Sequence, residues 1–398
     1  MLKLLLVMAL SALAAPTDRV IVVFKDGVGA LEQKTLLKAQ GLEIVDEIPA
    51  LRAVLVQAQP GQLHATLDAL AKHPKVLMTG EDVHRNWLEN FEIMSPAAVI
   101  KQAGPLQLTG RAPAPRFTDE APWGVKRVNA PAAWDRTQGA GVKVAVIDTG
   151  IDKDHPDLKV AGGHNALDKN QPWDDDHSHG THVAGSIAAA LNSAHVVGVA
   201  PKAELYAVKV LSKDGSGNLF AIMGGIMWTA QNGIQVANMS LGAPQEMALL
   251  KYALQMAAAQ GVLFVAAAGN DGKAVNWPAA YDETIAVSAL CPPGVTNTKL
   301  CTDTTERISA FSSRGPEVDL IAPGVNIPST VPLEVDASGV KAYSGTSMAA
   351  PHVAGLAALA IAAGKKDARA ALMAAAEKLP NMTASEQGAG LVNAAKLR

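Results

Sequence analysis

Aromatic and charged residues are scarce in this sequence. Of its 398 residues, 4% are Phe, Trp or Tyr and 18% are charged, whereas 49% are hydrophobic. A core must therefore be built mainly from Ala, Val, Leu and Ile. The low charge and high apolar content disfavour a disordered chain, and the length exceeds that of one ordinary domain.

The sequence lacks a long run of basic residues, and its formal net charge is −3. Charge therefore gives no support for binding to nucleic acid or to an anionic membrane surface. A membrane-spanning helix is not expected either. The apolar stretch at residues 349–363 contains Pro351 and His352 and is too short to cross a bilayer.

The N-terminus has the composition of a secretory signal peptide. Lys3 supplies a positive charge, an apolar run follows, and Ala-Leu-Ala at residues 12–14 fits a small-residue cleavage site. A buried N-terminal strand or helix is the alternative. We predict that residues 1–14 are a signal peptide and that the protein is secreted to the extracellular space, periplasm or cell envelope.

Cysteine is nearly absent, since only Cys291 and Cys301 occur. In an exported protein, two cysteines so close in sequence favour a local disulfide that closes a small loop. Two free thiols are the alternative. A metal site on this pair is disfavoured because neither His nor further Cys lies nearby.

Residues 15–88 are predicted to form a small domain. Apolar, β-branched runs typical of strands alternate with segments of helical spacing. The strand-like runs are residues 19–25, 51–58 and 75–82, and the helical ones are residues 30–41 and 61–73. We infer the order β-α-β-β-α-β, which indicates a ferredoxin-like α+β sandwich.

Residues 85–118 show no clean periodicity and are rich in Ala and Pro towards their end. We predict that residues 89–118 are an exposed, cleavable linker. Candidate cuts run from about Asn86 to Phe117.

From residue 119 to residue 398, short apolar runs alternate with helical segments. The strand-like runs are residues 142–148, 204–211, 234–242 and 262–270, and the helical ones include residues 181–191 and 246–261. This alternation predicts an α/β fold with a mostly parallel sheet and helices on both faces. In such sheets, ligands bind at the carboxyl ends of the strands.

Asp148 lies at the carboxyl end of one predicted strand, in the sequence AVIDTGID. A buried carboxylate needs a partner, because burying it unpaired is unfavourable. A turn or helix N-cap aspartate is the alternative interpretation.

His179 lies at the start of a predicted helix, in HGTHVAG. The helix dipole disfavours an imidazolium there, which favours a neutral base. A metal cluster of His177, His179 and His182 beside residues 174–176 is the rival. Its spacing does not match the i, i+4 histidines of a helical zinc site.

Ser347 opens another predicted helix, in GTSMAAPHVAG. Unpaired backbone N–H groups at a helix N-terminus stabilise an anion that forms there. An ordinary N-cap serine is the alternative. Together with Asp148 and His179, Ser347 supplies a carboxylate, an imidazole and a hydroxyl, because a serine nucleophile needs a base and the base needs an orienting acid.

The three blocks resemble those of subtilisin-like serine proteases, the subtilases, in which the order Asp, His, Ser on an α/β scaffold is known. The resemblance covers about residues 119–398. It implies that Asp148 orients the imidazole of His179, that His179 acts as general base and acid, and that Ser347 is the nucleophile. His182 and His352 would be structural. More weakly, the N-terminal domain resembles the family's inhibitory propeptide.

A fourth block, AAAGNDG, places Asn270 where the family has an asparagine that donates to the oxyanion, with the Ser347 backbone N–H as second donor. A Gly-Asn turn is the alternative. Further residues resemble the edges and floor of the substrate cleft, where an extended peptide would add as a strand. They are Ser216, Gly217, Ser240, Leu241, Gly242 and Asn276. No charged residue stands out near Asn276, so a broad apolar preference before the cut is expected.

The resemblance also implies a structural calcium site, because its matching ligands are loop oxygens. The ligands would be Asp157, Asn192, the carbonyls of Ala190, Ala194 and Val196, and Asp119 as a further carboxylate. Simple turn capping is the alternative.

The sequence therefore predicts a secreted endopeptidase that acts on proteins or peptides, is inhibited by its own propeptide, processes itself and is a monomer. A non-catalytic protein on a protease scaffold would have a damaged triad, and none is damaged here. An α/β-hydrolase esterase would have a G-x-S-x-G elbow and the residue order Ser, acid, His, whereas this sequence has GTSMA and the order Asp, His, Ser.

Overall fold

The computed structural model describes residues 18–89, 121–192, 194–295 and 299–397. These residues form two compact units. The described residues of the first lie within Met1–Arg85 and Asn218–Phe220, and those of the second lie within Asn86–Gly217 and Ala221–Arg398. The predicted signal peptide, most of the predicted linker and Asp119 lie outside the described residues. Each unit is described by itself.

The first unit contains a four-stranded antiparallel sheet in the order β2-β3-β1-β4. Its elements are β1 (Arg19–Phe24), α1 (Ala30–Ala39), β2 (Glu43–Ile48), β3 (Ala53–Gln57), α2 (Leu63–Ala71) and β4 (Val76–Glu81). The predicted order β-α-β-β-α-β and the ferredoxin-like character of this unit are confirmed.

Alternation along the strands builds the core of this unit. Val20, Val22 and Phe24 occupy every second position of β1 and therefore share one face of the sheet. They belong to one buried cluster with Leu37 of α1 and Leu70 of α2, all fully buried. The helical spacing seen in the sequence thus serves to cover this face.

The second unit is built on a nine-stranded sheet in the order β16-β17-β13-β12-β11-β10-β6-β8-β7. All neighbouring strands run parallel except β16 and β17. The strands are β6 (Lys143–Asp148), β7 (Val160–Asn165), β8 (Glu204–Lys209), β10 (Val236–Met239), β11 (Leu263–Ala267), β12 (Thr284–Leu290), β13 (Leu320–Pro323), β16 (Ala376–Glu377) and β17 (Leu391–Val392). Two further short strands are β5 (His84–Asn86) and β9 (Ser216–Asn218).

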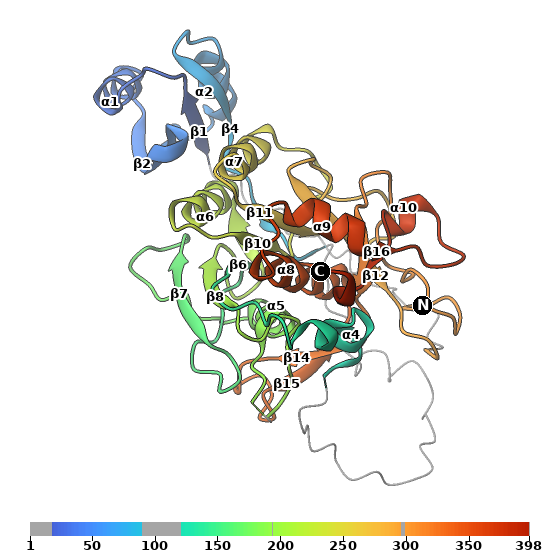
Figure 1. Cartoon of the computed structure of the whole chain (residues 1–398). Coiled ribbons are helices and arrows are strands. Elements are labelled where there is room, and N and C mark those ends of the chain that lie inside the picture. Colours follow the sequence, from blue (N-terminus) through green and yellow to red (C-terminus); the bar gives the residue numbers. More distant parts are fainter. Residues whose placement is uncertain (1–17, 90–120, 193, 296–298, 398) are drawn as a thin grey trace, which may run out of the picture. The chain divides into compact units, whose positions relative to one another are not determined.

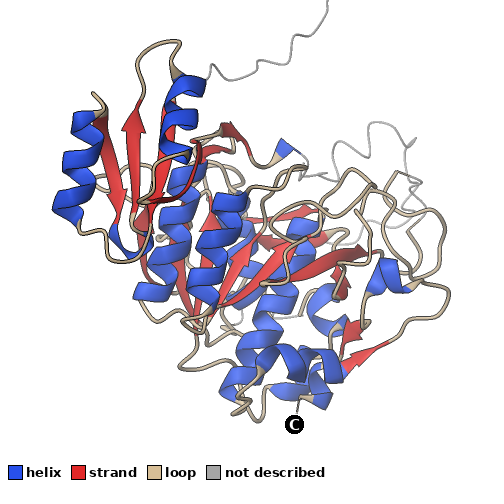
Figure 2. Cartoon of the chain, turned by 90° about the horizontal axis from the view of Figure 1, so that it is seen from above, coloured by secondary structure: helices blue, strands red, loops and turns tan. Residues whose placement is uncertain are grey.

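Helices cover both faces of this sheet, as Figure 2 shows. They are α4 (Trp123–Arg127), α5 (His179–Ala188), α6 (Leu219–Gln231), α7 (Ala248–Ala258), α8 (Thr346–Ala362), α9 (Ala368–Ala375) and α10 (Ala384–Gln387). Because both faces are covered, the central strands are apolar throughout, and Val144 to Ile147 are fully buried. The predicted parallel α/β fold is confirmed.

The strand order brings three carboxyl ends together. Strands β6, β10 and β11 are neighbours in the sheet, and their carboxyl ends lead into Asp148, Ser240 and Asn270. Helix α8 packs against β10, β11 and β12 and also against α5. A hairpin of β14 (Ile327–Thr330) and β15 (Val340–Tyr343) lies beside α5 (Figure 1).

The residues just before the predicted linker 89–118 are buried. Trp87 is fully buried and Leu88 is 7% exposed, and both belong to the second unit. Sequence periodicity could not predict the burial of these two residues, because they are too few to show a period and their contacts are distant in sequence.

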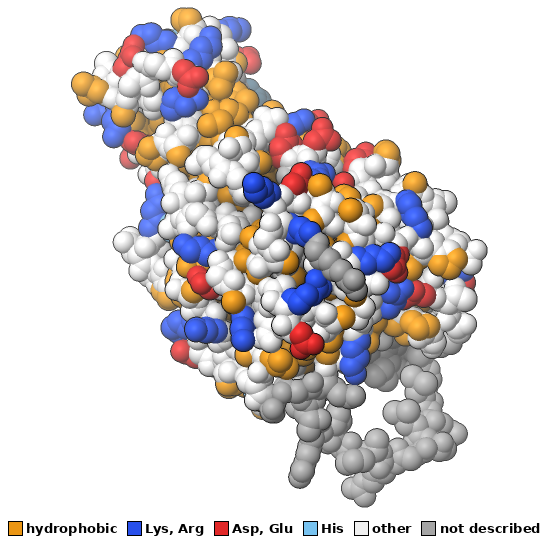
Figure 3. Space-filling view, viewed as in Figure 1, with side chains coloured by type: hydrophobic (Ala, Val, Ile, Leu, Met, Phe, Trp, Pro, Cys, Tyr) orange, Lys and Arg blue, Asp and Glu red, His pale blue; other side chains and the backbone are white. Residues whose placement is uncertain are grey.

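Figure 3 shows Lys, Arg, Asp and Glu side chains of both signs interspersed on the visible face. Among the described residues, no helix combines the length and the apolar character needed to cross a membrane.

Cys291 and Cys301 form a disulfide, which confirms the bridged alternative. The bridge closes a loop after β12, and this loop is held further by bonds from Cys291 N to Arg307 O (2.8 Å) and from Ser309 Oγ to Leu300 O (2.7 Å). It therefore stabilises a segment whose described residues, between β12 and β13, include no helix or strand.

Replacing Cys291 and Cys301 together by Ser should lower the free energy of unfolding by about 2–3 kcal/mol, because the open loop gains conformational freedom in the unfolded chain. Differential scanning calorimetry of a chain that also carries Ser347→Ala, which prevents self-cleavage, would measure this. The bridged chain treated with a reductant is the control and should lose the same stability. An unchanged Tm in both would contradict the prediction.

Candidate active site

A buried hydrogen bond joins His179 to Asp148. Asp148 ends β6 and His179 is the first residue of α5, and both are fully buried. His179 Nδ1 lies 2.8 Å from Asp148 Oδ1 and 2.9 Å from Oδ2. The carboxylate also accepts a bond from Thr149 N (2.7 Å). This arrangement fixes the ring and favours the tautomer with hydrogen on Nδ1, which leaves Nε2 as the basic nitrogen.

The Nε2 atom of His179 is buried and has no hydrogen-bond partner among the described residues. Ser347 is the second residue of α8, is 1% exposed, and donates from Oγ to Ser240 O at 3.2 Å. Ser240 Oγ in turn donates to Ser347 O (2.9 Å). The long Ser347 bond leaves its hydroxyl weakly held, and catalytic hydrogen bonds are often loose in ligand-free sites.

Asn270 follows β11 and presents a free donor. Its Oδ1 accepts from Thr346 N and Thr346 Oγ1, both at 2.8 Å, so the orientation of the amide is set. Its Nδ2 is buried without a partner among the described residues. A Cβ atom at Gly345 would lie 3.1 Å from this Nδ2, which shows that the amide nitrogen lies beside the turn leading into α8. An unpaired buried N–H group next to a candidate nucleophile is what an oxyanion site requires.

Asp175 organises the loop before His179, and sequence reasoning did not single it out. Its Oδ1 accepts from Thr149 Oγ1 (2.8 Å) and Ser178 N (3.0 Å), and its Oδ2 accepts from Thr181 N (2.9 Å). Ser178 has φ +104°, a conformation that a non-glycine residue rarely adopts, and its Oγ lies 3.0 Å from Tyr343 Oη. These bonds stabilise the loop in the conformation that presents His179.

The neighbouring carboxylates have different partners. Asp174 pairs with Lys153 (2.7 Å), and Asp176 pairs with Lys209 (2.6 Å), whose Nζ also donates to Thr149 O (2.6 Å). The three adjacent aspartates in the sequence were the available signal, and in the sequence analysis they were named only as neighbours of a disfavoured histidine metal cluster.

His182 and His352 are fully buried. Burial, followed by the nearby His179, lowers the pKa of His182 to about 3, although its Nε2 lies 3.0 Å from Ile327 O. Burial lowers the pKa of His352 to about 4, and its Nδ1 lies 2.8 Å from Met348 O. Both rings are therefore neutral at physiological pH and act as packing and hydrogen-bonding groups.

The residues expected to line the substrate cleft lie on two segments, Ser216–Gly217 and Ser240–Gly242. Both segments and their neighbours form hydrogen bonds with a third segment, which contains Trp87. Trp87 N donates to Gly215 O (3.0 Å), and Gly242 N donates to Trp87 O (3.0 Å). The Trp87 indole nitrogen donates to Gly217 O (2.8 Å). Ser216 is tied locally, with its N bonded to Asp214 Oδ1 (3.1 Å). Trp87 thus has backbone bonds to both segments, which indicates that an extended chain fits between the segment at Gly215 and the segment at Gly242.

Leu241 and Asn276 are buried near these segments. Asn276 N donates to Ala268 O (2.9 Å), and a Cβ atom at Gly269 would lie 2.2 Å from Asn276 Nδ2. Gly269 has φ +113°, so this approach needs glycine on both counts. Asn276 Nδ2 has no partner among the described residues and lies beside the residue that precedes Asn270.

The candidate calcium ligands Asp157 and Val196 come together. Asp157 is fully buried, its Oδ2 accepts from Val196 N (3.1 Å), and its Oδ1 has no partner among the described residues. Burial raises the pKa of the Asp157 carboxyl above its ordinary value, against hydrogen bonds from Val196 and Asn192. A buried, half-satisfied carboxylate of this kind suits a cation.

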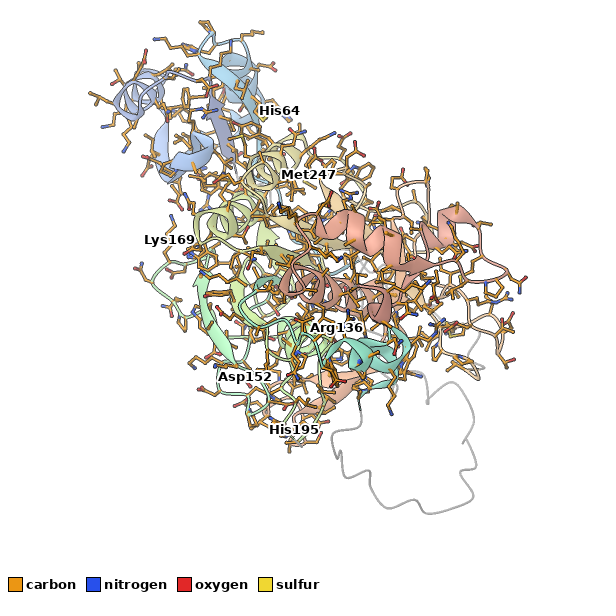
Figure 4. All side chains as sticks on the ribbon, in the orientation of Figure 1. His64, Arg136, Asp152, Lys169, His195 and Met247 are labelled. Carbon is orange, nitrogen blue, oxygen red and sulfur yellow. A yellow bond between two sulfur atoms is a disulfide. The ribbon has the colours of Figure 1, made fainter. Side chains whose placement is uncertain are left out.

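The remaining candidate ligands lie in the same loop. Ala190 N donates to Asp157 O (2.9 Å), and Ala194 N donates to Asn192 Oδ1 (3.0 Å). Figure 4 labels His195 in this loop and Asp152 in the loop after β6. Among the described residues, no group of three or more His, Cys, Asp or Glu side chains is placed to hold a metal ion. Backbone carbonyls would therefore have to supply most of the ligands.

Comparison with known proteins identifies the family. Residues 139–390 match the subtilase family, and residues 13–79 match the fervidolysin N-terminal prodomain. Subtilisin Savinase of Lederbergia lenta is 49% identical over 240 residues, which cover 60% of this chain and 83% of that protein. M-protease of Shouchella clausii (strain KSM-K16) is 48% identical over 245 residues, or 61% of this chain and 60% of that protein.

A solved structure extends the similarity to nearly the whole chain. The crystal structure of fervidolysin from Fervidobacterium pennivorans, a keratinolytic enzyme related to subtilisin, matches with a TM-score of 0.77 and 26% identity. The match covers 96% of this chain and 60% of that one, so this chain spans less than two thirds of fervidolysin and of M-protease. The chain belongs to the subtilase family and carries a prodomain of the fervidolysin type.

Proposed function

We propose that this protein is a secreted serine endopeptidase that hydrolyses peptide bonds in proteins through an acyl-enzyme. The observation that carries the proposal is the buried bond from His179 Nδ1 to Asp148 (2.8 Å), together with a His179 Nε2 that has no hydrogen-bond partner in the described part of the chain. An imidazole held in this way is a general base whose basic nitrogen is available. The packing of α5 against α8, whose first turns carry His179 and Ser347, supports their joint action.

In the proposed mechanism, Ser347 Oγ attacks the scissile carbonyl while His179 Nε2 takes its proton. Asp148 keeps hydrogen on Nδ1 and stabilises the imidazolium that forms. The Asn270 amide and the Ser347 backbone N–H donate to the oxyanion. His179 then protonates the leaving amine, and a water molecule repeats the sequence on the acyl-enzyme. The specificity before the cut is broad and apolar, since Leu241 and the floor around Asn276 bring no charge.

The N-terminal domain acts as a propeptide that assists folding and blocks the cleft until it is cut. A parallel sheet has many contacts between distant residues and folds slowly, so assistance is useful. The enzyme makes this cut itself within residues 86–117, after residues 1–14 have directed export. The mature protein is a monomer.

A calcium ion stabilises the loop of residues 189–196. Asp157, Asn192 and the carbonyls of Ala190, Ala194 and Val196 hold it, with Asp119 as a further carboxylate. The support for this site is the buried Asp157 Oδ1, which has no hydrogen-bond partner among the residues that the structure describes. The ion is structural and takes no part in the chemical steps.

Replacing Ser347 by Ala should abolish both casein hydrolysis and maturation, because no other hydroxyl can form the acyl-enzyme. Loss of the nucleophile lowers kcat by about a millionfold in subtilisin. Electrophoresis and N-terminal sequencing of the purified chain should show the unprocessed precursor. Ser338→Ala, which changes an exposed serine, is the control and should mature normally. Maturation of the purified Ser347→Ala chain would refute self-processing.

Replacing Asn270 by Asp should lower kcat about a hundred- to a thousandfold, the loss known for one oxyanion donor in subtilisin. Aspartate keeps an oxygen for Thr346 N but removes the Nδ2 donor, so KM should change little. Steady-state kinetics on a chromogenic peptide would separate the two constants. A large rise in KM at unchanged kcat would instead place Asn270 in substrate binding.

Removing calcium with a chelator should lower the Tm, and adding it back should restore the Tm, because an ion that binds only the folded state stabilises it. Asp157→Asn should remove this calcium dependence, whereas Asp154→Asn, at an exposed neighbour, should keep it. Calorimetry and titration calorimetry with calcium give readouts independent of activity. Equal calcium responses in the two variants would exclude Asp157 as a ligand.

A further inference from the structure

The backbone of Trp87 is bound on both sides within the second unit. Its N–H donates to Gly215 O and its carbonyl accepts from Gly242 N, both at 3.0 Å. Gly215 precedes Ser216, and Gly242 follows Leu241, so these contacts come from the two segments that the sequence analysis assigned to the substrate cleft. Trp87 thus occupies the place of an added strand.

The side chain of Trp87 is enclosed as well as bound. It is 0% exposed, and its indole Nε1 donates to Gly217 O at 2.8 Å. Tryptophan is one of the largest apolar side chains and needs a partner for its N–H when buried. Here the cavity accepts the whole ring and the Gly217 carbonyl satisfies the donor.

The residues on either side fix the backbone around Trp87. Asn86 Nδ2 donates to Asp214 O (2.9 Å), and Asn86 Oδ1 accepts from Leu88 N (2.7 Å). A Cβ atom at Gly215 would lie 3.1 Å from Leu88 Cδ1, so the leucine lies directly over this glycine. The sequence Asn-Trp-Leu is therefore complementary to the cleft in backbone and side chains.

A different aromatic residue would fit less well. Phenylalanine fills much of the same volume but has no N–H, so the Gly217 carbonyl would be buried without its bond. A smaller side chain would leave a cavity in addition. The hydrogen bond thus distinguishes an indole from other apolar groups.

We propose that the cleft contains a tryptophan-selective pocket, which residues Asn86–Leu88 fill in the precursor and which peptide substrates bearing Trp fill in the mature enzyme. This inference rests on the proposed endopeptidase function and deepens it, because it adds an indole-selective pocket beside Gly217 to the broad apolar preference proposed for the floor around Asn276. The substrate class is proteins with an exposed tryptophan.

The first test uses the enzyme matured from the full chain. Peptides N-acetyl-Asn-X-Leu-amide are compared as competitive inhibitors of a chromogenic substrate, with X as Trp, 3-benzothienylalanine, Phe or Ala. Benzothienylalanine matches the indole in shape but has sulfur in place of N–H. We expect Phe and benzothienylalanine to bind about tenfold more weakly than Trp, and Ala at least about thirtyfold more weakly. Equal binding of Trp and benzothienylalanine would overturn the indole selectivity.

The second test needs no catalysis. In the full chain carrying Ser347→Ala, Trp87→Ala should increase hydrogen exchange of the amides of residues 86–88 at least about thirtyfold. Trp134→Phe is the matched control, since Trp134 also donates one indole bond, to Val199 O (3.0 Å), and lies outside the cleft. Unchanged protection of residues 86–88 in Trp87→Ala would overturn the proposed pocket.

The two proposals fail in different ways. Casein hydrolysis with no preference among the four peptides would leave the endopeptidase and remove the tryptophan pocket. A chain that neither cleaves casein nor reacts with a fluorophosphonate at Ser347, yet loses protection in Trp87→Ala, would remove the endopeptidase and leave the pocket as a binding site for the chain's own segment.

Discussion

His179 is held by one buried hydrogen bond, from Nδ1 to the carboxylate of Asp148, and the arrangement of the site depends on it. A carboxylate with no exposed surface must be compensated, and Thr149 N and the imidazole supply that compensation. Within the described ranges Nε2 has no hydrogen-bond partner, which is an unfavourable state for a buried basic nitrogen. The folded chain keeps this state because the loop anchored by Asp175 and the start of α5 fix the ring from both sides.

Small residues make the close packing around this bond feasible. A Cβ atom at Gly180 would lie 2.0 Å from Gly150 O, and one at Gly355 would lie 2.6 Å from Val199 Cβ. The glycines and alanines that follow His179 and Ser347 in sequence therefore let α5 and α8 approach their neighbours without side chains in between. The scarcity of aromatic residues and the abundance of alanine in the sequence are consistent with this close packing, because both keep the side chains small.

The backbone of the segments assigned to the cleft is also fixed by hydrogen bonds. Gly215 and Gly242 are bonded to a strand-like segment of the chain itself, and a tryptophan side chain fills the space beside Gly217. A precursor that fills its own cleft gains stability from contacts that substrates must later replace. Under the proposed function, residues 86–88 would therefore resemble the substrates that later occupy the same place.

The sequence by itself determined the parallel α/β fold, the ferredoxin-like N-terminal unit and the candidates Asp148, His179 and Ser347, because these depend on local periodicity and on short blocks of residues. Tertiary structure alone decided that the Asp175 carboxylate anchors the loop before His179, that Cys291 and Cys301 are bridged, and that Trp87 is buried. Each of these rests on partners distant in sequence, or on a choice between alternatives equal in composition. Such contacts leave no periodic signal, since a single side chain and a few backbone groups meet only after the sheet and its helices have formed.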